Sequence, residues 1–180
     1  MQAKTISKTE IALHWIVGLG MIILIGLGLY MGQTNAYSLY PFHKSIGVLL
    51  LVFILARVVI RMRKGWPDNM GSGAAWEHKL AHVIHWILIL GTLVMPLSGV
   101  IDAVMAGRGL SVFGLELIGS NINAKGQPTA ISTGLSDTAS TVHGIVGKLL
   151  IAAILLHIAG AFKHDLVDRD GTLRRMLGRA

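Results

Sequence analysis

The feature that most constrains this chain is a set of four long apolar segments, at residues 11–31, 42–62, 80–106 and 139–162. Each has about the 20 residues that a helix needs to cross roughly 30 Å of hydrocarbon. Hydrophobic residues make up 53% of the chain and charged residues 14%, which is too apolar for an ordinary soluble domain. We therefore expect an all-α membrane protein, a bundle of four transmembrane helices in a single domain over residues 1–180.

The Lys and Arg residues predict how the bundle is oriented. Four spans place both termini on one side, and twelve of the 16 Lys and Arg fall on that side, many of them at the termini and in the 63–79 connection. By the positive-inside rule this side is cytoplasmic, so the 32–41 and 107–138 connections face the periplasm. We expect a multi-pass protein of the bacterial inner membrane, with a small amphipathic or irregular cap in the 107–138 connection.

Charge and cysteine content exclude several classes of protein. The net charge is +7, but the Lys and Arg adjoin apolar segments and form no basic stripe with interleaved aromatics, which argues against nucleic-acid binding. There is no cysteine, so iron–sulfur clusters on thiolates, disulfides and covalent haem attachment are all excluded. Any haem must be held by coordination and packing.

Histidines in the apolar segments indicate where the chemistry lies. Ionisable residues are rare inside membranes and are usually functional. His43 and His143 begin the second and fourth segments, so both lie near the periplasmic face. His14 and His157 lie at matching depth near the cytoplasmic face. The topology therefore predicts two histidine pairs at two levels of the bilayer.

The spacing along the fourth segment connects the two levels. His143 and His157 are fourteen residues apart, which is about 21 Å along a helix and four turns of roughly 3.5 residues, so both rings leave nearly the same face. Neutral imidazole is a good iron ligand, and two imidazoles leave no axial position open for dioxygen. The pattern predicts two b haems stacked across the bilayer for electron transfer. The structural alternative is that these histidines only hydrogen-bond between helices.

Other polar residues leave several interpretations open. His78, His82 and His85 follow an i, i+4, i+7 stripe, which suits a solvated surface, part of a quinone pocket, or a metal or alternative haem site. His82 and His85 therefore compete with the cytoplasmic pair as ligands. We consider contact with a haem propionate for three cations near the apolar segments: Lys148, Arg57 and Arg61. The alternative for Lys148 is snorkelling to the interface. The alternative for the two arginines is a role in setting the topology.

The sequence resembles the prokaryotic cytochrome b561 family over nearly its whole length. The similar segments are TEIALHWIVG, FHKSIGVLLLVFILARVVIR, LAHVIHWILIL and, most specifically, VHGIVGKLLIAAILLHIAGAFKHDLVDRDGTLRRML. The resemblance implies that His43 and His143 ligate a periplasmic haem and that His14 and His157 ligate a cytoplasmic one. It also associates His164 with the quinone end, where relatives often have two consecutive histidines and this chain has one after Lys163.

The resemblance further implies an activity. Family members include enzymes that move electrons from periplasmic superoxide to membrane ubiquinone, and related bundles serve as cytochrome subunits of hydrogenases and formate dehydrogenases. We expect a superoxide:ubiquinone oxidoreductase with a quinone site near His82, His85 and His164. The alternative is an electron-transfer subunit that docks on a periplasmic dehydrogenase or hydrogenase through the 107–138 connection. A non-redox metal transporter that uses the histidine stripe is a third hypothesis, which bound haem would exclude.

Overall fold

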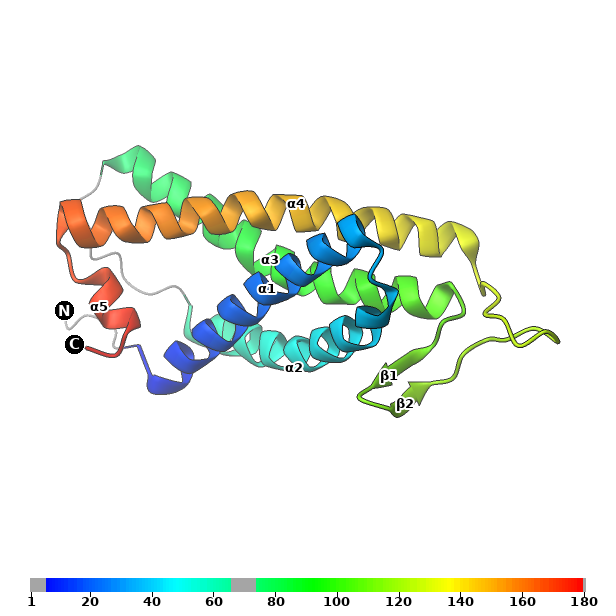
Figure 1. Cartoon of the computed structure of the whole chain (residues 1–180). Helices are drawn as coiled ribbons and strands as arrows, with labels where there is room; N and C mark the ends of the chain where they lie inside the picture. The colour runs from blue at the N-terminus through cyan, green and yellow to red at the C-terminus, as the bar shows by residue number, and fades with distance from the viewer. Residues whose placement is uncertain (1–5, 66–73, 180) are drawn as a thin grey trace.

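The structure of the protein is a computed structural model that describes residues 6–65 and 74–179. Four long helices account for most of it (Figure 1). In chain order the elements are α1 (Lys8–Thr34), the 3-10 turn η1 (Tyr37–Leu39), α2 (Tyr40–Lys64), α3 (Ala75–Met105), β1 (Leu110–Val112), β2 (Leu115–Ile118), α4 (Thr133–Lys163), the π-helical turn η2 (His164–Asp168) and α5 (Thr172–Met176).

The four long helices confirm the predicted four-span architecture, because each is long and apolar enough to cross a membrane. Most of them extend beyond the predicted spans. The largest difference is α4, which begins at Thr133 where the sequence predicted residue 139. Its first turns are polar, so hydropathy misses them, but the Ser132 side chain accepts a hydrogen bond from the Leu135 amide and caps the helix. Residues 66–73 of the predicted 63–79 connection lie outside the described residues.

Local signals determine where α1 begins and how it joins its neighbour. Ser7 and Glu10 form a capping box, in which each side chain accepts a hydrogen bond from the other residue's amide. The same Glu10 carboxylate pairs with Lys64 at 2.8 Å. Because Lys64 is the last residue of α2, this ion pair ties the start of α1 to the end of α2.

The helices pack as two close pairs, α1 with α2 and α3 with α4, and α2 also contacts α3. Glycines allow close approach within each pair: a Cβ on Gly20 would lie 2.8 Å from the Leu50 side chain, and one on Gly91 would lie 2.8 Å from Leu150. The core lies at mid-height and contains Val17, Met21, Leu24, Leu50, Ile54 and Leu150. The centre of the bundle is therefore apolar.

Large apolar side chains also cover the outside of the helices. Ile23 is 63% exposed, Val52 61% and Leu155 63%, and all three lie in the middle of long helices. A soluble protein rarely exposes so continuous an apolar surface, whereas lipid solvates it without cost. The outer surface therefore fits a bilayer.

The two ends of the bundle differ in structure (Figure 1). The start of α1, the end of α4 and α5 lie together at one end, which we call the terminal end. The β1–β2 hairpin lies at the other, which we call the hairpin end. Both described chain ends are at the terminal end, as an even number of spans requires.

The hairpin is a feature that the sequence analysis missed when it predicted an amphipathic or irregular cap. Strands β1 and β2 pair antiparallel across a two-residue turn at Phe113 and Gly114, both with positive φ. The Phe113 amide donates to Ser45 Oγ of α2 at 2.9 Å, which fastens the hairpin to the bundle. Asp102 binds Arg108 at 2.7 Å and accepts a hydrogen bond from Ser136 at 2.8 Å. The connection from α3 to α4 is thus ordered over the hairpin end.

Candidate functional site

One register of fourteen residues runs through all four long helices. In each helix, a residue near the hairpin end has a counterpart fourteen positions away near the terminal end. The pairs, hairpin end first, are Gly28 and His14 in α1, His43 and Arg57 in α2, Gly99 and His85 in α3, and His143 and His157 in α4. Four turns at this spacing keep both members on nearly the same helix face. Two levels of side chains, about 21 Å apart along a helix, therefore face inward above and below the apolar core.

At the hairpin end, His43 of α2 and His143 of α4 face each other. Their ring centroids are 6.3 Å apart. A glycine lies beside each ring: a Cβ on Gly28 would lie 3.4 Å from His43, and one on Gly99 would lie 3.1 Å from His143. Larger residues at either glycine would crowd the imidazoles, so the glycines leave room around this pair.

Hydrogen bonds orient the His143 ring. Its Nδ1 lies 2.9 Å from the Met95 carbonyl oxygen and 3.2 Å from Ser98 Oγ. A carbonyl oxygen can only accept, so Nδ1 carries the proton and Nε2 keeps its lone pair. A backbone carbonyl on one ring nitrogen is the usual support for a histidine that ligates a metal through the other.

His43 carries a buried nitrogen, Nδ1, for which the described residues provide no hydrogen-bond partner. An unsatisfied buried polar group costs about 1–3 kcal/mol. His43 Nδ1 therefore can take a further hydrogen-bond or coordination partner. No carboxylate forms an ion pair with either ring of this level in the described part of the chain.

At the terminal end, three histidines cluster. The His157 ring centroid lies 6.0 Å from that of His14 and 5.3 Å from that of His85. His85 comes from α3, the helix that packs most extensively against α4, whereas His14 comes from α1, which packs mainly against α2. The cluster thus brings together the predicted pair and one of its rivals.

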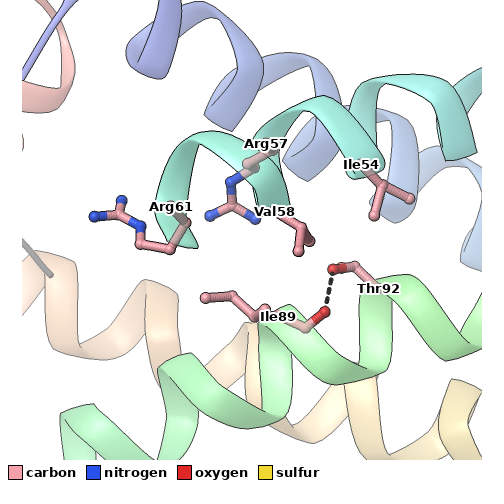
Figure 2. A pocket seen from close by; sticks show the side chains of 6 residues that line it. All are labelled: Ile54, Arg57, Val58, Arg61, Ile89 and Thr92. Carbon is pink, nitrogen blue, oxygen red and sulfur yellow. Dashed lines mark hydrogen bonds between the residues drawn. The ribbon is translucent and has the colours of Figure 1, made fainter. Parts of the chain in front are cut away.

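Arg57 completes this level. Its Nη2 lies 3.4 Å from His14 Nδ1. Arg57 and Arg61 of α2 line a narrow crevice together with Ile89 and Thr92 of α3 (Figure 2). In Figure 2 the Arg57 guanidinium lies over the crevice, while Arg61 extends away from it; the Arg61 side chain donates to the Gly65 carbonyl at 3.0 Å. Of the two arginines, Arg57 is therefore the one that lies beside the histidine cluster.

The histidine stripe of α3 continues beyond this cluster toward the terminal end. His82 is exposed one turn nearer the terminal end, and its Nε2 accepts a hydrogen bond from the Trp86 indole at 3.0 Å. In residues 6–65 and 74–179, the stripe brings no three potential metal ligands close together; the group that does converge is His164, Asp168 and Asp170.

His164 lies just past α4 in an ion-pair network. Its Nδ1 is 2.7 Å from Asp170 and 3.2 Å from Asp168. Burial raises the pKa of Asp170, but hydrogen bonds from Thr172 and His164 outweigh this and hold the pKa below its usual value. His164 pairs with Asp168 and Asp170, whereas His82 contacts Trp86 and His85 contacts His157, so these contacts of the quinone candidates lie in different parts of the terminal end.

Lys163 links the same network to α3. Its Nζ binds Glu77 at 2.8 Å and Asp168 at 3.0 Å. Lys148, by contrast, is exposed on the surface of α4, well round the helix from His143. This position suits a side chain that snorkels to the interface better than one that contacts a cofactor between the helices.

The two histidine levels fit b haems. Metal–imidazole bonds are about 2 Å long, so two imidazoles on opposite sides of one iron have ring centres roughly 6 Å apart. The observed separations are 6.3 Å and 6.0 Å. Paired neutral imidazoles in an apolar bundle, with no thiolate in the chain, are the donor set of a noncovalently held haem.

A four-helix membrane bundle with facing histidines at two levels defines the class of membrane-bound b-type electron-transfer cytochromes. Comparison with known families agrees: the model of the prokaryotic cytochrome b561 family matches residues 5–179. The chain belongs to that family. It is accordingly a multi-pass protein of the bacterial inner membrane, of a family that binds haem b and transfers electrons.

Three curated relatives cover nearly the whole chain. Cytochrome b561 homolog 1 of Escherichia coli K12 is 30% identical over 178 residues, 96% of this chain and 97% of the relative. Cytochrome b561 homolog 2 of the same organism is 27% identical over 174 residues, 94% and 89% of the two chains. The probable superoxide oxidase CybB of Yersinia pestis is 29% identical over 179 residues, 97% and 96% of the two chains.

The sequence analysis missed several residues of this site. Gly99 was not linked to the histidines, although it stands fourteen residues from His85 of its own helix. That spacing was the available signal. The Met95 carbonyl and Ser98, which orient His143, carried no such signal, because they depend on how α3 and α4 align.

Proposed function

We propose that this protein binds two b haems, one at each histidine level, and transfers electrons across the bilayer from superoxide to ubiquinone. The observation that carries the proposal is the pair of facing imidazoles at each of two levels, with α4 contributing to both. When bound, a b haem with two imidazole ligands supplies a one-electron iron couple that has no open axial position.

His43 and His143 hold the haem of the hairpin end. The support is the 6.3 Å separation, the free lone pair on His143 Nε2 and the glycine beside each ring. The role of the chain here is to fix the ring of His143 through Met95 and to keep larger side chains away.

His14 and His157 hold the haem of the terminal end, in preference to His85. A flat macrocycle must fit between the two ligating helices, and α3 and α4 are the most closely packed pair, with Gly91 against Leu150. His85 and His157 therefore come from the more closely packed pair of helices. His14 faces His157 from a helix that packs mainly elsewhere.

Arg57 is proposed to bind a propionate of this haem. Its guanidinium can only donate, so the 3.4 Å contact uses the lone pair of His14 Nδ1. If Nε2 of His14 held the haem iron, Nδ1 would carry the proton and could no longer accept from Arg57. The guanidinium would then be available for a carboxylate, which it binds strongly. Arg61 is a second candidate at the same crevice, and Lys148 is the weakest because it is exposed.

The hairpin end is proposed to face the periplasm. Twelve of the 16 Lys and Arg follow the terminal side of the predicted topology, which the positive-inside rule assigns to the cytoplasm. A donor in the periplasm would therefore meet the His43/His143 level first, and the acceptor would meet the His14/His157 level.

The donor and acceptor are proposed as superoxide and ubiquinone. The support is similarity along 97% of the chain to a relative named probable superoxide oxidase. Two superoxide anions each lose one electron and leave as dioxygen, and one quinone gains two electrons and two protons. His85, His82 and His164 are the proposed proton-carrying groups at the quinone end, because an imidazole ring can accept a proton at one nitrogen and donate one from the other.

The test is kinetic. Superoxide added to the purified protein should reduce its haems, and added ubiquinone should reoxidise them. The oxidase assignment fails if superoxide leaves the haems oxidised, or if the reduced protein consumes dioxygen faster than it reduces ubiquinone.

A second candidate is an electron-transfer subunit that docks on a periplasmic redox protein. The observation that favours it is the apolar surface of the hairpin and the following loop: Phe113 is 59% exposed, Leu115 67% and Ile122 60%. Such surfaces often mark interaction sites. A subunit would co-purify with its partner and would show no reduction by superoxide in isolation.

A further inference from the structure

The C-terminal segment forms a groove that combines basic and apolar side chains. After η2 the chain reverses at Arg169 and Gly171, both with positive φ, and α5 folds back beside the start of α1 (Figure 1). The Trp15 indole donates to the Met176 carbonyl at 2.8 Å and fixes α5 there. Residues of η2, α5 and the adjoining turns line the groove: Asp165, Leu166, Arg169, Gly171, Leu173, Arg174, Leu177 and Arg179.

The carboxylates near this groove are largely committed to other partners. Asp168 binds Lys163 and His164, and Asp170 accepts hydrogen bonds from His164 and Thr172. Asp165 is the acidic residue in the groove lining, against three arginines. None of the four arginines at positions 169, 174, 175 and 179 forms an ion pair with any residue in the described ranges.

Arg175 belongs to the same basic segment, although it does not line the groove. Its Nε and Nη1 are buried, and neither has a hydrogen-bond partner in the part of the chain that the structure describes. A buried guanidinium without an acceptor is costly, and the group forms its strongest hydrogen bonds with carboxylates and phosphates. The segment thus holds more buried and exposed positive charge than the protein itself neutralises.

Apolar residues of the same segment face outward. Leu166 is 66% exposed and Leu177 48%, and both line the groove. The segment follows directly on α4, which is long and apolar enough to cross a membrane, so its expected depth is the headgroup region. Basic and apolar side chains together at that depth match the two parts of an anionic phospholipid, its phosphodiester and the start of its acyl chains.

We propose that this groove binds one anionic phospholipid of the surrounding bilayer. Arg169, Arg174 and Arg179 contact the headgroup phosphate, and Leu166 and Leu177 contact the glycerol and upper acyl region. The bound lipid would hold α5 against the start of α1, next to Trp15. The proposal depends on the protein being in a membrane and is independent of the electron donor and acceptor.

The experiment is native mass spectrometry of the purified haem-loaded protein with phosphatidylglycerol or phosphatidylcholine of identical acyl chains. We expect wild type to retain phosphatidylglycerol preferentially and R174Q/R179Q to weaken that binding by roughly tenfold or more. R174K/R179K, which keeps the charge, should retain the preference. The matched control R63Q/K8Q removes two exposed cations of the terminal end that lie outside the groove, and it should behave as wild type.

Three outcomes would overturn the proposal. Wild type could bind both lipids equally, or R63Q/K8Q could lose the preference as fully as R174Q/R179Q, which would indicate diffuse surface charge. Alternatively, sodium phosphate could displace the bound lipid at equal concentration, which would indicate a simple anion site. Unchanged haem absorption in each variant establishes that its bundle is folded.

Discussion

The two histidine levels share a register but differ in what surrounds the rings. At the hairpin end, α1 and α3 present Gly28 and Gly99, which leave space beside the imidazoles of α2 and α4. At the terminal end, α2 and α3 present Arg57 and His85, so the imidazoles of α1 and α4 have a cation and a third histidine beside them. One four-turn spacing thus places glycines beside the rings at one level, and an arginine and a third histidine beside them at the other.

This difference has a chemical consequence. A fixed positive charge stabilises the reduced state of a nearby redox centre, because reduction lowers the centre's own charge. The terminal-end site should therefore have the higher reduction potential, and electrons should flow toward it from the hairpin end. Because Arg57 lies at the terminal-end level, we predict electron flow from the hairpin end toward the terminal end.

The largest effect should come from removing ligands. We expect His43→Ala to abolish the hairpin-end haem alone and His14→Ala to abolish the terminal-end haem alone, because each iron loses an axial ligand. The haem-to-protein ratio and the optical spectrum of each variant would measure this. His85→Ala serves as the control and should keep both haems. Loss of a haem in His85→Ala, with both haems retained in His14→Ala, would show that His85 and not His14 is the partner of His157.

The next effect tests the space at the hairpin end. A Cβ on Gly99 would already lie 3.1 Å from His143, and Gly99→Leu adds further side-chain atoms there. We expect it to lower the affinity for haem at this level by about tenfold, which is roughly 1.4 kcal/mol. Haem titration of the apoprotein would measure it. Gly26→Leu is the matched control, since nothing lies within 4 Å of a Cβ there. An equal loss of haem affinity in both variants would show that the space beside His143 has no particular role in haem binding.

The smallest effect tests the charge at the terminal end. Arg57→Gln should lower the midpoint potential of the terminal-end haem by tens of millivolts, where about 59 mV corresponds to a tenfold change in the one-electron equilibrium. Arg57→Lys keeps the charge and should retain most of the potential. Potentiometric titration of the two haem bands would measure both. A shift confined to the hairpin-end haem, or none at all, would contradict the comparison between the two levels.

Much of this fold followed from the sequence, because hydrophobic length alone specifies a membrane span. The predicted spans were correct in number and short at several ends, since the polar first turns of α4 after Thr133 do not register as apolar. The β1–β2 hairpin was not predicted. Its Phe113–Gly114 turn has no Asn-Gly or Asp-Gly signal, and its anchor to Ser45 joins residues far apart in the chain.

The candidate site divides in the same way. The pairing of His43 with His143 and of His14 with His157 was predictable, because depth in a bilayer follows from position along a span. The proximity of His85 to His157 and the outward position of Lys148 depend on helix rotation and packing, which hydropathy does not determine. The acidic partners of His164 lie in a turn that no periodic pattern describes.

The most direct test of the central claim is the haem content of the purified wild-type protein, measured as reduced-minus-oxidised absorbance together with a haem-to-protein ratio. The account predicts two b haems per chain, distinguishable in the α band or by potential because their surroundings differ. One haem per chain, or none, would contradict it.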